Sequence, residues 1–290
     1  MSLESSELVL NPDGSLYHIA LRPNQVNDDV IVVGDPGRVD LIATFLDSVS
    51  SGIQNREFYT RVGSYNGTRL TVMSTGIGTD NIDIAINELD AAVNIDLQKR
   101  VPKEFRRSLR IIRLGTSGAL QEDIKVDTCV SSKYGLGLDG LMNYYQVEFT
   151  SSERSLRDAF IFDTTYPLNL AKPYVVESDV DLRLRIAPDL VQGITATASG
   201  FYAPQGRVLR IPLAHPGLNQ SFTEFSWNNQ QIVNYEMETS ALYGLGRRLG
   251  HRTCTVCAVI ANRLRKEYSK DYQATIRSMV AEVLERLTAH

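Results

Sequence analysis

The sequence predicts an α/β protein in which helices cover a mixed central sheet. Short apolar runs such as 30–33 and 110–114 have the length and composition of buried strands, and each leads into a glycine-containing turn. Amphipathic stretches typical of helices, such as 272–287, alternate with these runs. Strands that alternate with helices are typical of a sheet with helices on its faces.

The first half of the chain repeats one pattern: a strand followed by a glycine turn. The strands are predicted at 30–33, 69–74 and 110–114, the turns at 34–37, 75–78 and 115–118, and helices over 39–46 and after 78. We expect Asp80 or Asn81 to cap the second helix, whose apolar face carries Ile82, Ile86 and Leu89.

The second half adds strands at 192–199 and 253–260 and a final helix over 272–287. No repeat, low-complexity tract or linker interrupts the chain, so we expect one domain over residues 1–290. Ligands of such sheets usually bind at the carboxyl ends of the strands, and all three predicted glycine turns fall there.

Composition excludes several classes of protein. The net charge of −4 gives no basic footprint for nucleic acid. No apolar run approaches the roughly 20 residues that a transmembrane helix needs, and residues 1–11 lack the layout of a signal peptide. We therefore expect a cytoplasmic protein with neither a nucleic-acid nor a membrane partner.

The sequence contains little that indicates a metal site, a redox-active cysteine pair or a catalytic triad. Cys254 and Cys257 form a C-x-x-C, but on a strand their side chains point to opposite faces, so they cannot act as a pair. The histidines are scattered, and no His or Cys cluster has metal spacing, so we expect no metal site and no Ser-His-Asp triad. Gly135-Leu136-Gly137-Leu138-Asp139-Gly140 matches a dinucleotide fingerprint, but no helix is predicted directly after it, which argues against NAD.

Two carboxylates flank a methionine in Glu236-Met237-Glu238, where an extended run turns into a helix. Burying an unpaired carboxylate costs several kcal/mol, of the order of 3 or more, so a polar partner is expected against them. A sugar diol fits that requirement.

Two further groups of residues favour an anion and a planar heterocycle. Gly34-Asp35-Pro36-Gly37-Arg38 opens a helix, where backbone N–H groups and the dipole favour an anion, and Arg113 with 115–118 offers a similar set. In 201–207, Gln205 and Arg207 can present donors and an acceptor to a ring on which Phe201 stacks. An ordinary turn and a solvated loop are the alternative readings of these two groups.

In combination and in order, these segments resemble the nucleoside phosphorylase family and, within it, the uridine phosphorylases. The resemblance implies a three-layer α/β/α fold with a mixed central sheet. The matching segments are Tyr17-His18-Ile19, Gly34-Asp35-Pro36-Gly37-Arg38, Arg56-Glu57-Phe58, Ser74-Thr75-Gly76-Ile77-Gly78, Arg113-Leu114-Gly115-Thr116-Ser117-Gly118-Ala119, Phe201-Tyr202 with Gln205 and Arg207, and Asn234-Tyr235-Glu236-Met237-Glu238.

The resemblance also implies the roles of individual residues. Phosphate would be held by Gly34, Arg38, Arg113, Thr116 and, from a neighbouring subunit, Arg56. Ribose would be bound by Glu236, Met237, Glu238 and the neighbour's His18, which belongs to an N-terminal arm over 1–29. The base would be read by Phe201, Gln205, Arg207 and Arg263. Arg207, Gln205, Arg113 and Glu238 would carry the catalysis.

The implied reaction is the reversible phosphorolysis of uridine, with deoxyuridine or thymidine as further candidates, in pyrimidine salvage. Inorganic phosphate is then a co-substrate, and no metal or organic cofactor is needed. Purine members of the family carry an aspartate near Asn262, so Asn262 beside Arg263 favours a pyrimidine. A purine nucleoside phosphorylase, a phosphate-independent nucleosidase and a noncatalytic nucleoside-binding protein stay open as alternatives.

The assembly implied is a homo-oligomer with shared active sites, a dimer at minimum or a hexamer. The stretch 94–107 is longer than in compact bacterial members and is similar to the dimeric eukaryotic enzymes. Some relatives bind a monovalent cation between subunits through a glutamate and a serine. Here Glu57 is present but Asn81 stands at the serine position, which puts that cation in doubt.

Overall fold

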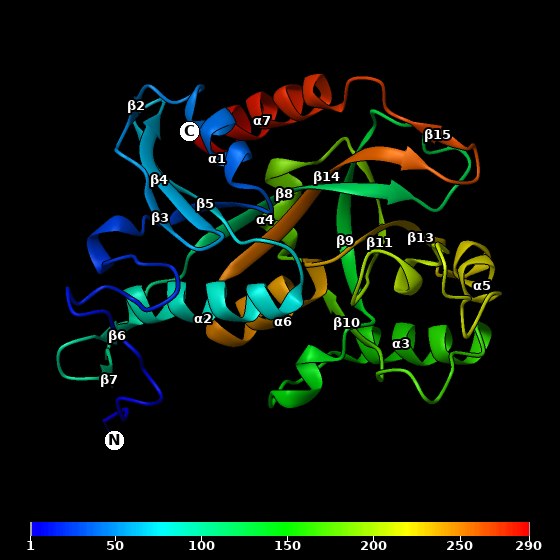
Figure 1. Ribbon diagram of the computed structural model, residues 1–290, viewed down its shortest axis with the longest axis horizontal. Helices are drawn as coiled ribbons and strands as arrows, with labels where there is room; N and C mark the ends of the chain where they lie inside the picture. The colour runs from blue at the N-terminus through cyan, green and yellow to red at the C-terminus, as the bar shows by residue number, and fades with distance from the viewer. Residues whose placement is uncertain (1, 290) are drawn as a thin grey trace.

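Helices pack on both faces of a large sheet in this computed structural model, which describes residues 2–289 (Figure 1). Met1 and His290, the two ends of the expected domain, lie outside the described residues. The α-helices are α1 Pro36–Ala43, α2 Thr79–Asn94, α3 Ser151–Asp163, α4 Val180–Ile186, α5 Leu218–Glu224, α6 Thr239–Leu249 and α7 Tyr272–Thr288. The strands are β1 Asp29–Val33, β2 Ser48–Val49, β3 Ile53–Asn55, β4 Phe58–Tyr65, β5 Thr68–Ser74, β6 Ile95–Asp96, β7 Val101–Pro102, β8 Arg110–Ala119, β9 Cys129–Gly137, β10 Tyr174–Glu177, β11 Val191–Thr197, β12 Ser226–Trp227, β13 Gln230–Glu236, β14 Arg252–Asn262 and β15 Glu267–Tyr268.

The sheet mixes parallel and antiparallel neighbours, as predicted. Its strand order is β12-β13-β11-β9-β14-β8-β1-β5-β4-β2, and β13 also pairs with β8. The pairings β13–β11, β11–β9, β9–β14, β14–β8 and β8–β13 therefore close a ring within the sheet. The ring brings the carboxyl ends of β8 and β13, which are far apart in sequence, next to each other.

Strand β1 shows how the sequence builds the layers. Its side chains alternate between two hydrophobic clusters: Val30 and Val32 pack with α2 and α6, while Ile31 and Val33 pack with α1, α4 and α7. A strand that is apolar at every position is required here because both faces are covered. The predicted three-layer arrangement is thus confirmed for this part of the molecule.

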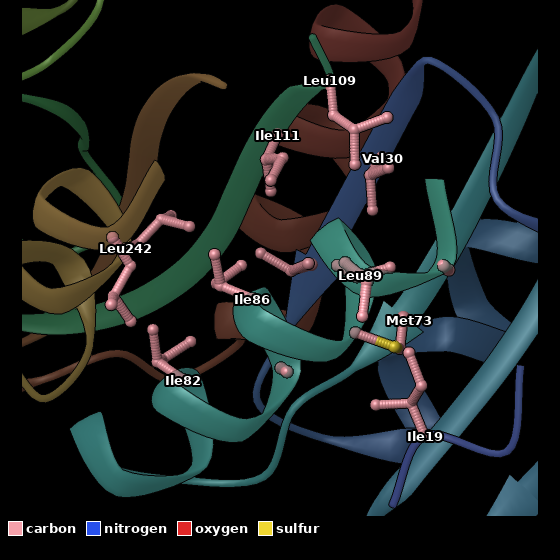
Figure 2. Packing of buried hydrophobic residues seen from close by; sticks show 14 of the residues in the cluster. Ile19, Val30, Met73, Ile82, Ile86, Leu89, Leu109, Ile111 and Leu242 are labelled. Atoms are coloured by element: carbon pink, nitrogen blue, oxygen red, sulfur yellow. The ribbon is translucent and has the colours of Figure 1, made fainter. Parts of the chain in front are cut away.

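The cluster between β1 and helix α2 contains the apolar face predicted for the helix that follows residue 78. Ile82, Ile86 and Leu89 are fully buried there; Ile82 lies beside Leu242 of α6 and Leu89 points toward Met73 of β5 (Figure 2). A third cluster packs α3 and α5 against β9, β11 and β13. That cluster anchors α5 beside the loop that follows β11.

Two predicted element boundaries are wrong. The helix predicted over 39–46 is α1 Pro36–Ala43, because Asp35 caps it by accepting a hydrogen bond from the Gly37 N–H at 3.2 Å and Pro36 suits the first helical turn. Phe45 and Leu46 are apolar because they pack beyond the helix end.

The expected turn at 115–118 is also wrong, since β8 continues to Ala119. β14 pairs with β8 along its whole length, and β13 pairs with Gly118 and Ala119. A Cβ at Gly115 would lie 2.0 Å from Arg113 Nη1, so glycine here makes room for an arginine side chain rather than for a turn.

The predicted cap of α2 is wrong as well. The helix starts after Gly78, which has φ 101° and holds the cap position in place of Asp80 or Asn81. The Gly78 N–H donates to Glu238 Oε1 at 2.7 Å. A carboxylate distant in sequence thus supplies the acceptor, which no local pattern could reveal.

Three features of the described chain concern functions that the sequence argued against. β9 runs through Gly137, and a 3₁₀ turn over Leu141–Tyr144 follows Gly140 in place of the α-helix that a dinucleotide site needs. Cys254 and Cys257 lie in different hydrophobic clusters, as expected for opposite faces of β14. Within residues 2–289, no helix is both long and apolar enough to cross a membrane.

Candidate active site

A cavity of about 310 Å³ lies where β8, β13 and β14 meet the loops after β1, β5 and β11. It is the site expected at the carboxyl ends of the strands. It is lined by Gly34, Asp35, Arg38, Ile77, Arg113, Thr116, Ser117, Gly118, Phe201, Gln205, Arg207, Tyr235, Glu236, Met237, Glu238, Ile260, Ala261 and Tyr268. Ten of the thirteen residues that the sequence proposed are in this list.

Arg113 forms the charged centre of the cavity. Its guanidinium pairs with Glu238 through Nη2 and lies 3.3 Å from Glu236 Oε2 through Nη1. Burial opposes its charge, but the two carboxylates outweigh burial and raise the pKa of Arg113 above its ordinary value. The cation therefore stays charged next to any ligand.

Glu238 differs from Glu236 in what its oxygens contact. Glu238 holds Arg113 and the Gly78 N–H, and burial raises the pKa of its carboxyl despite the neighbouring Arg113. Glu236 accepts hydrogen bonds from Thr197 Oγ1 and from the N–H groups of Glu238 and Thr239 at the start of α6. Glu236 is thus committed to the β13–α6 junction, and its assignment to ribose stays a prediction.

The side of the cavity that was expected to bind phosphate is built from two adjacent turns. Gly34 follows β1, and a Cβ on it would lie 3.4 Å from the carbonyl oxygen of Gly76 in the turn after β5. Arg38, on the first turns of α1, donates to the Leu114 carbonyl oxygen at 3.0 Å. Burial, then the charge of Arg113, lowers the pKa of Arg38, so an incoming dianion would relieve unfavourable charge there.

The side of the cavity that was expected to face the base consists of the loop that follows β11. Arg207 Nη1 donates to Gln205 Oε1 at 2.7 Å and to the Phe201 carbonyl oxygen at 2.6 Å. The guanidinium carbon of Arg207 lies 3.7 Å from the centre of the Phe201 ring, a cation–π contact. Gln205 Nε2 makes no hydrogen bond with the described part of the chain, so it can donate to a ligand.

Arg263 supports this loop from behind. Its Nη2 donates to the Gln205 carbonyl oxygen, and it does not line the cavity. The neighbouring Asn262 is fully buried: its amide donates to the carbonyl oxygens of Gln121 and Ile124 and accepts from the Arg265 N–H. Asn262 is therefore a structural residue with no free polar atom for a base.

His18 and Arg56 lie outside this cavity but near each other on the surface. The His18 ring nitrogen Nδ1 is 2.6 Å from Glu88 Oε1, and Asn55 Nδ2 donates to the His18 carbonyl oxygen. Arg56 is exposed, has φ 55° and lies 5.7 Å from the ring centre of Tyr17. The structure thus groups the two residues that were expected to act on a neighbouring subunit.

The residues considered for a cation also lie together. A Cβ at Gly76 would be 2.4 Å from Asn81 Nδ2 and 2.9 Å from Glu57 Cγ. Asn81 Nδ2 donates to the Ile77 carbonyl oxygen. Among residues 2–289, no group of three or more His, Cys, Asp or Glu side chains is arranged to hold a metal ion.

Several lining residues had no assigned role at the sequence level. Ile260, Ala261 and Tyr268 come from the end of β14 and from β15, and Tyr235 precedes the Glu236-Met237-Glu238 stretch. The alternation of β13 places Tyr235 and Glu236 on opposite sides, so the cavity must wrap around the strand end to reach both. The sequence offers one indication for Tyr235: it directly precedes the Glu236-Met237-Glu238 stretch on the same strand.

Comparisons with known proteins agree with this geometry. A family model described as the phosphorylase superfamily matches residues 28–289. A uridine phosphorylase of Thermococcus kodakarensis is 32% identical over 278 residues, which cover 92% of this chain and 84% of that protein. A purine nucleoside phosphorylase of Geobacillus stearothermophilus is 27% identical over 272 residues, covering 92% of this chain and 97% of that one.

Among solved structures, a Trypanosoma brucei nucleoside phosphorylase, described as showing uridine phosphorylase activity, superposes with a TM-score of 0.88. It is 28% identical, and the match covers 98% of this chain and 100% of that chain. Similarity therefore extends over the whole sheet and the cavity.

Proposed function

Because this chain belongs to the phosphorylase superfamily and is an enzyme of the nucleoside phosphorylase kind, we propose that its substrate is uridine. In the proposed reaction, phosphate attacks the anomeric carbon of the ribose, and the bond from that carbon to the base nitrogen breaks. The bonding electrons leave with the base, which takes up a proton and departs as uracil, while the sugar leaves as ribose 1-phosphate. This reaction would serve pyrimidine nucleoside salvage.

The Gln205–Arg207 pair is the observation that carries the pyrimidine preference. Gln205 Oε1 is held by Arg207 Nη1, which leaves Gln205 Nε2 and the rest of the guanidinium free to donate to the two carbonyl oxygens of uracil. These donors would stabilise the negative charge that develops on the leaving base. Loss of one such donor costs roughly 3 kcal/mol of transition-state stabilisation in comparable sites.

The remaining polar residues would hold the other two reactants. The turn at Gly34, with Arg38, Arg113 and Thr116, offers cations, N–H groups and a hydroxyl to phosphate. Glu238 would accept hydrogen bonds from the ribose hydroxyls while Met237 packs against the sugar. Fixing phosphate and sugar in one pose supplies much of the rate enhancement by proximity.

Purine cleavage is the second candidate, since purine nucleoside phosphorylases are among the relatives. Purine chemistry calls for a group that can protonate the departing ring. Asn262, at the position considered for that role, has its amide bonded to Gln121, Ile124 and Arg265. Because these bonds occupy the Asn262 amide, it cannot protonate a purine ring, and a pyrimidine substrate is favoured over a purine.

A second copy of the chain completes the site in our proposal. His18 and Arg56 lie together on the surface, outside the cavity of their own chain. We assign the neighbour's Arg56 to the phosphate and the neighbour's His18 to the 5′-hydroxyl of the sugar, in a dimer at minimum. Cys129, Cys254 and Cys257 are unpaired thiols, which fits a reducing compartment, so we place the enzyme in the cytoplasm.

One panel of assays tests the proposal: uridine, thymidine, inosine and adenosine, each with and without phosphate. We expect phosphate-dependent release of uracil from uridine, with no added metal or organic cofactor. Preference for inosine would establish the purine alternative, and cleavage without phosphate would indicate a nucleosidase. Uridine binding without turnover at any phosphate concentration would indicate a binding protein.

A further inference from the structure

The base-reading loop, residues 201–207, separates two cavities. Gln205 and Arg207 line the active-site cavity on one side. Ala203, Pro204 and Gly206 line a second cavity of about 260 Å³ on the other side. Because neither side of the loop is fully packed, hydrogen bonds rather than close packing must fix its position.

Few of these bonds tie the loop to the rest of the molecule. Inside the loop, Arg207 bonds Phe201 and Gln205, and the N–H groups of Gln205 and Arg207 donate to Tyr202. From outside, the Gln205 carbonyl oxygen receives Arg263 Nη2 and, at 3.0 Å, Asn219 Nδ2. Arginine is a long and adaptable side chain, so the short Asn219 side chain is the more rigid of the two anchors.

Asn219 approaches the loop closely. Gly206 has φ 67°, and a Cβ there would lie 2.1 Å from Asn219 Nδ2. Gly206 therefore meets two demands at once, a left-handed backbone and direct contact with the amide. Asn219 is on α5, which the third hydrophobic cluster holds against β13.

The other end of the Asn219 amide is also occupied. Its Oδ1 accepts a hydrogen bond from the Tyr235 hydroxyl at 2.8 Å. Tyr235 is buried, lies next to Glu236 on β13 and pairs with Gly118 of β8. The amide thus bridges the loop that reads the base and the strand that carries the sugar-binding residues.

We propose that Asn219 is a positioning residue. It fixes the distance between the loop that carries Gln205 and Arg207 and the strand end that holds the ribose. An asparagine is suited to this because one planar side chain both donates and accepts, so the distance between the two partners is fixed. The inference rests on the proposed function, in which Gln205 and Arg207 contact the base.

The test compares Asn219→Ala and Tyr235→Phe with the wild type. We expect the KM for the nucleoside to rise about fivefold in each variant, the usual effect of one lost hydrogen bond, while the KM for phosphate stays within twofold. The double variant should be no worse than the more affected single variant, because both changes break one bridge. Amide hydrogen exchange over 201–207 should accelerate in both variants.

A matched control is Gln220→Ala, since Gln220 is the next residue of α5, is exposed and bonds Glu224 on the same helix. Its KM values and loop exchange should match the wild type. A purely structural role for Asn219 would instead lower thermal stability and change both KM values together, or neither. That result, or unchanged exchange over 201–207, would overturn the inference.

The assays use whichever nucleoside of the panel the wild type cleaves fastest, so failure of the two proposals can be told apart. A wild type that prefers inosine overturns the pyrimidine assignment, while the variants still report on the loop. A wild type that prefers uridine, with variants indistinguishable from it, overturns the role of Asn219 alone. If Asn219→Ala fails to fold, Tyr235→Phe removes the same bridge and leaves its ring in the core.

Discussion

At the scale of single residues, Glu238 concentrates most of the site's chemistry. It is only 4% exposed, yet it contacts Arg113, caps the turn before α2 through Gly78, and lines the cavity. Burial raises the pKa of Glu238, so its carboxyl takes up a proton at a higher pH than an ordinary glutamate, for which the value is about 4.3. In the proposed function, protonation removes an acceptor for the ribose hydroxyls.

The first prediction therefore concerns Glu238→Gln. The KM for uridine should rise about tenfold, because a hydrogen bond to a charged acceptor is worth about 1.5 kcal/mol. In the wild type, kcat/KM should fall on the acid side as Glu238 takes up its proton, and the variant should lack that decline. Initial rates measured across pH, at saturating phosphate, decide between the outcomes.

The same pKa shift makes a statement about stability. Because the folded-state pKa of Glu238 is raised, protonation favours the folded state. This contribution is complete below the unfolded-state value of about 4.3 and is lost as the pH rises through the folded-state pKa. Relative to Glu238→Gln, the wild type should lose unfolding free energy in urea titrations as the pH rises above the unfolded-state value. An equal pH dependence of the two proteins would contradict the raised pKa.

At the scale of elements, the junction between β13 and α6 is held by Glu236. Its carboxylate accepts the N–H groups of Glu238 and Thr239 and the hydroxyl of Thr197, all of them buried. This arrangement satisfies free donors at the start of α6 and fixes the backbone that presents Met237 and Glu238.

The second prediction is that Glu236→Ala lowers the free energy of unfolding by about 3 kcal/mol, since several buried donors lose their acceptor at about 1–3 kcal/mol each. Urea unfolding followed by circular dichroism measures the loss. Glu122→Ala, which removes an exposed carboxylate, should change stability by less than about 0.5 kcal/mol. A loss below 1 kcal/mol for Glu236→Ala would contradict the capping role.

The errors made from sequence also belong to this scale. The pattern of apolar residues correctly indicated strands at the positions of β1, β5, β8, β11 and β14, the apolar face of α2 and the extent of α7, but it did not indicate β4 or β9. It failed at Gly115, which was predicted to lie in a turn, and at Gly78, where the cap of the helix was assigned to Asp80 or Asn81 instead. At Gly78 the N–H donates to Glu238, and at Gly115 a Cβ would collide with Arg113 two residues earlier and with Cys257 of the neighbouring strand β14. Glu238 and Cys257 are distant in sequence, and local patterns contain no information about such contacts.

At the scale of the whole molecule, the closure of the sheet explains why the site could be anticipated only as separate pieces. Each segment, such as Glu236-Met237-Glu238, suggested a ligand from its residue types. Their convergence depends on the antiparallel pairing of β13 with β8, which joins strand ends more than 100 residues apart. The resemblance to a family supplied that convergence, whereas Asn219 and Tyr268 had no motif to identify them.

The remaining question at this scale is whether a second chain supplies Arg56. If it does, an Arg56→Ala chain and an Arg207→Ala chain, each inactive alone, should restore each other in a mixed dimer. One of the two sites would combine an intact cavity with an intact neighbouring Arg56, so the mixed dimer should have about half of the wild-type activity. Co-expression with two different affinity tags isolates it.

A control pair sharpens this experiment, because Arg113 and Arg207 line the same cavity. Mixed oligomers of Arg113→Ala and Arg207→Ala chains contain no intact cavity and should stay inactive. Recovery with Arg56→Ala but not with Arg113→Ala would mean that the neighbour completes the phosphate site. Absence of recovery in both pairs, or full activity of Arg56→Ala alone, would mean that each chain binds phosphate without its neighbour, and that the surface group of His18 and Arg56 has another purpose.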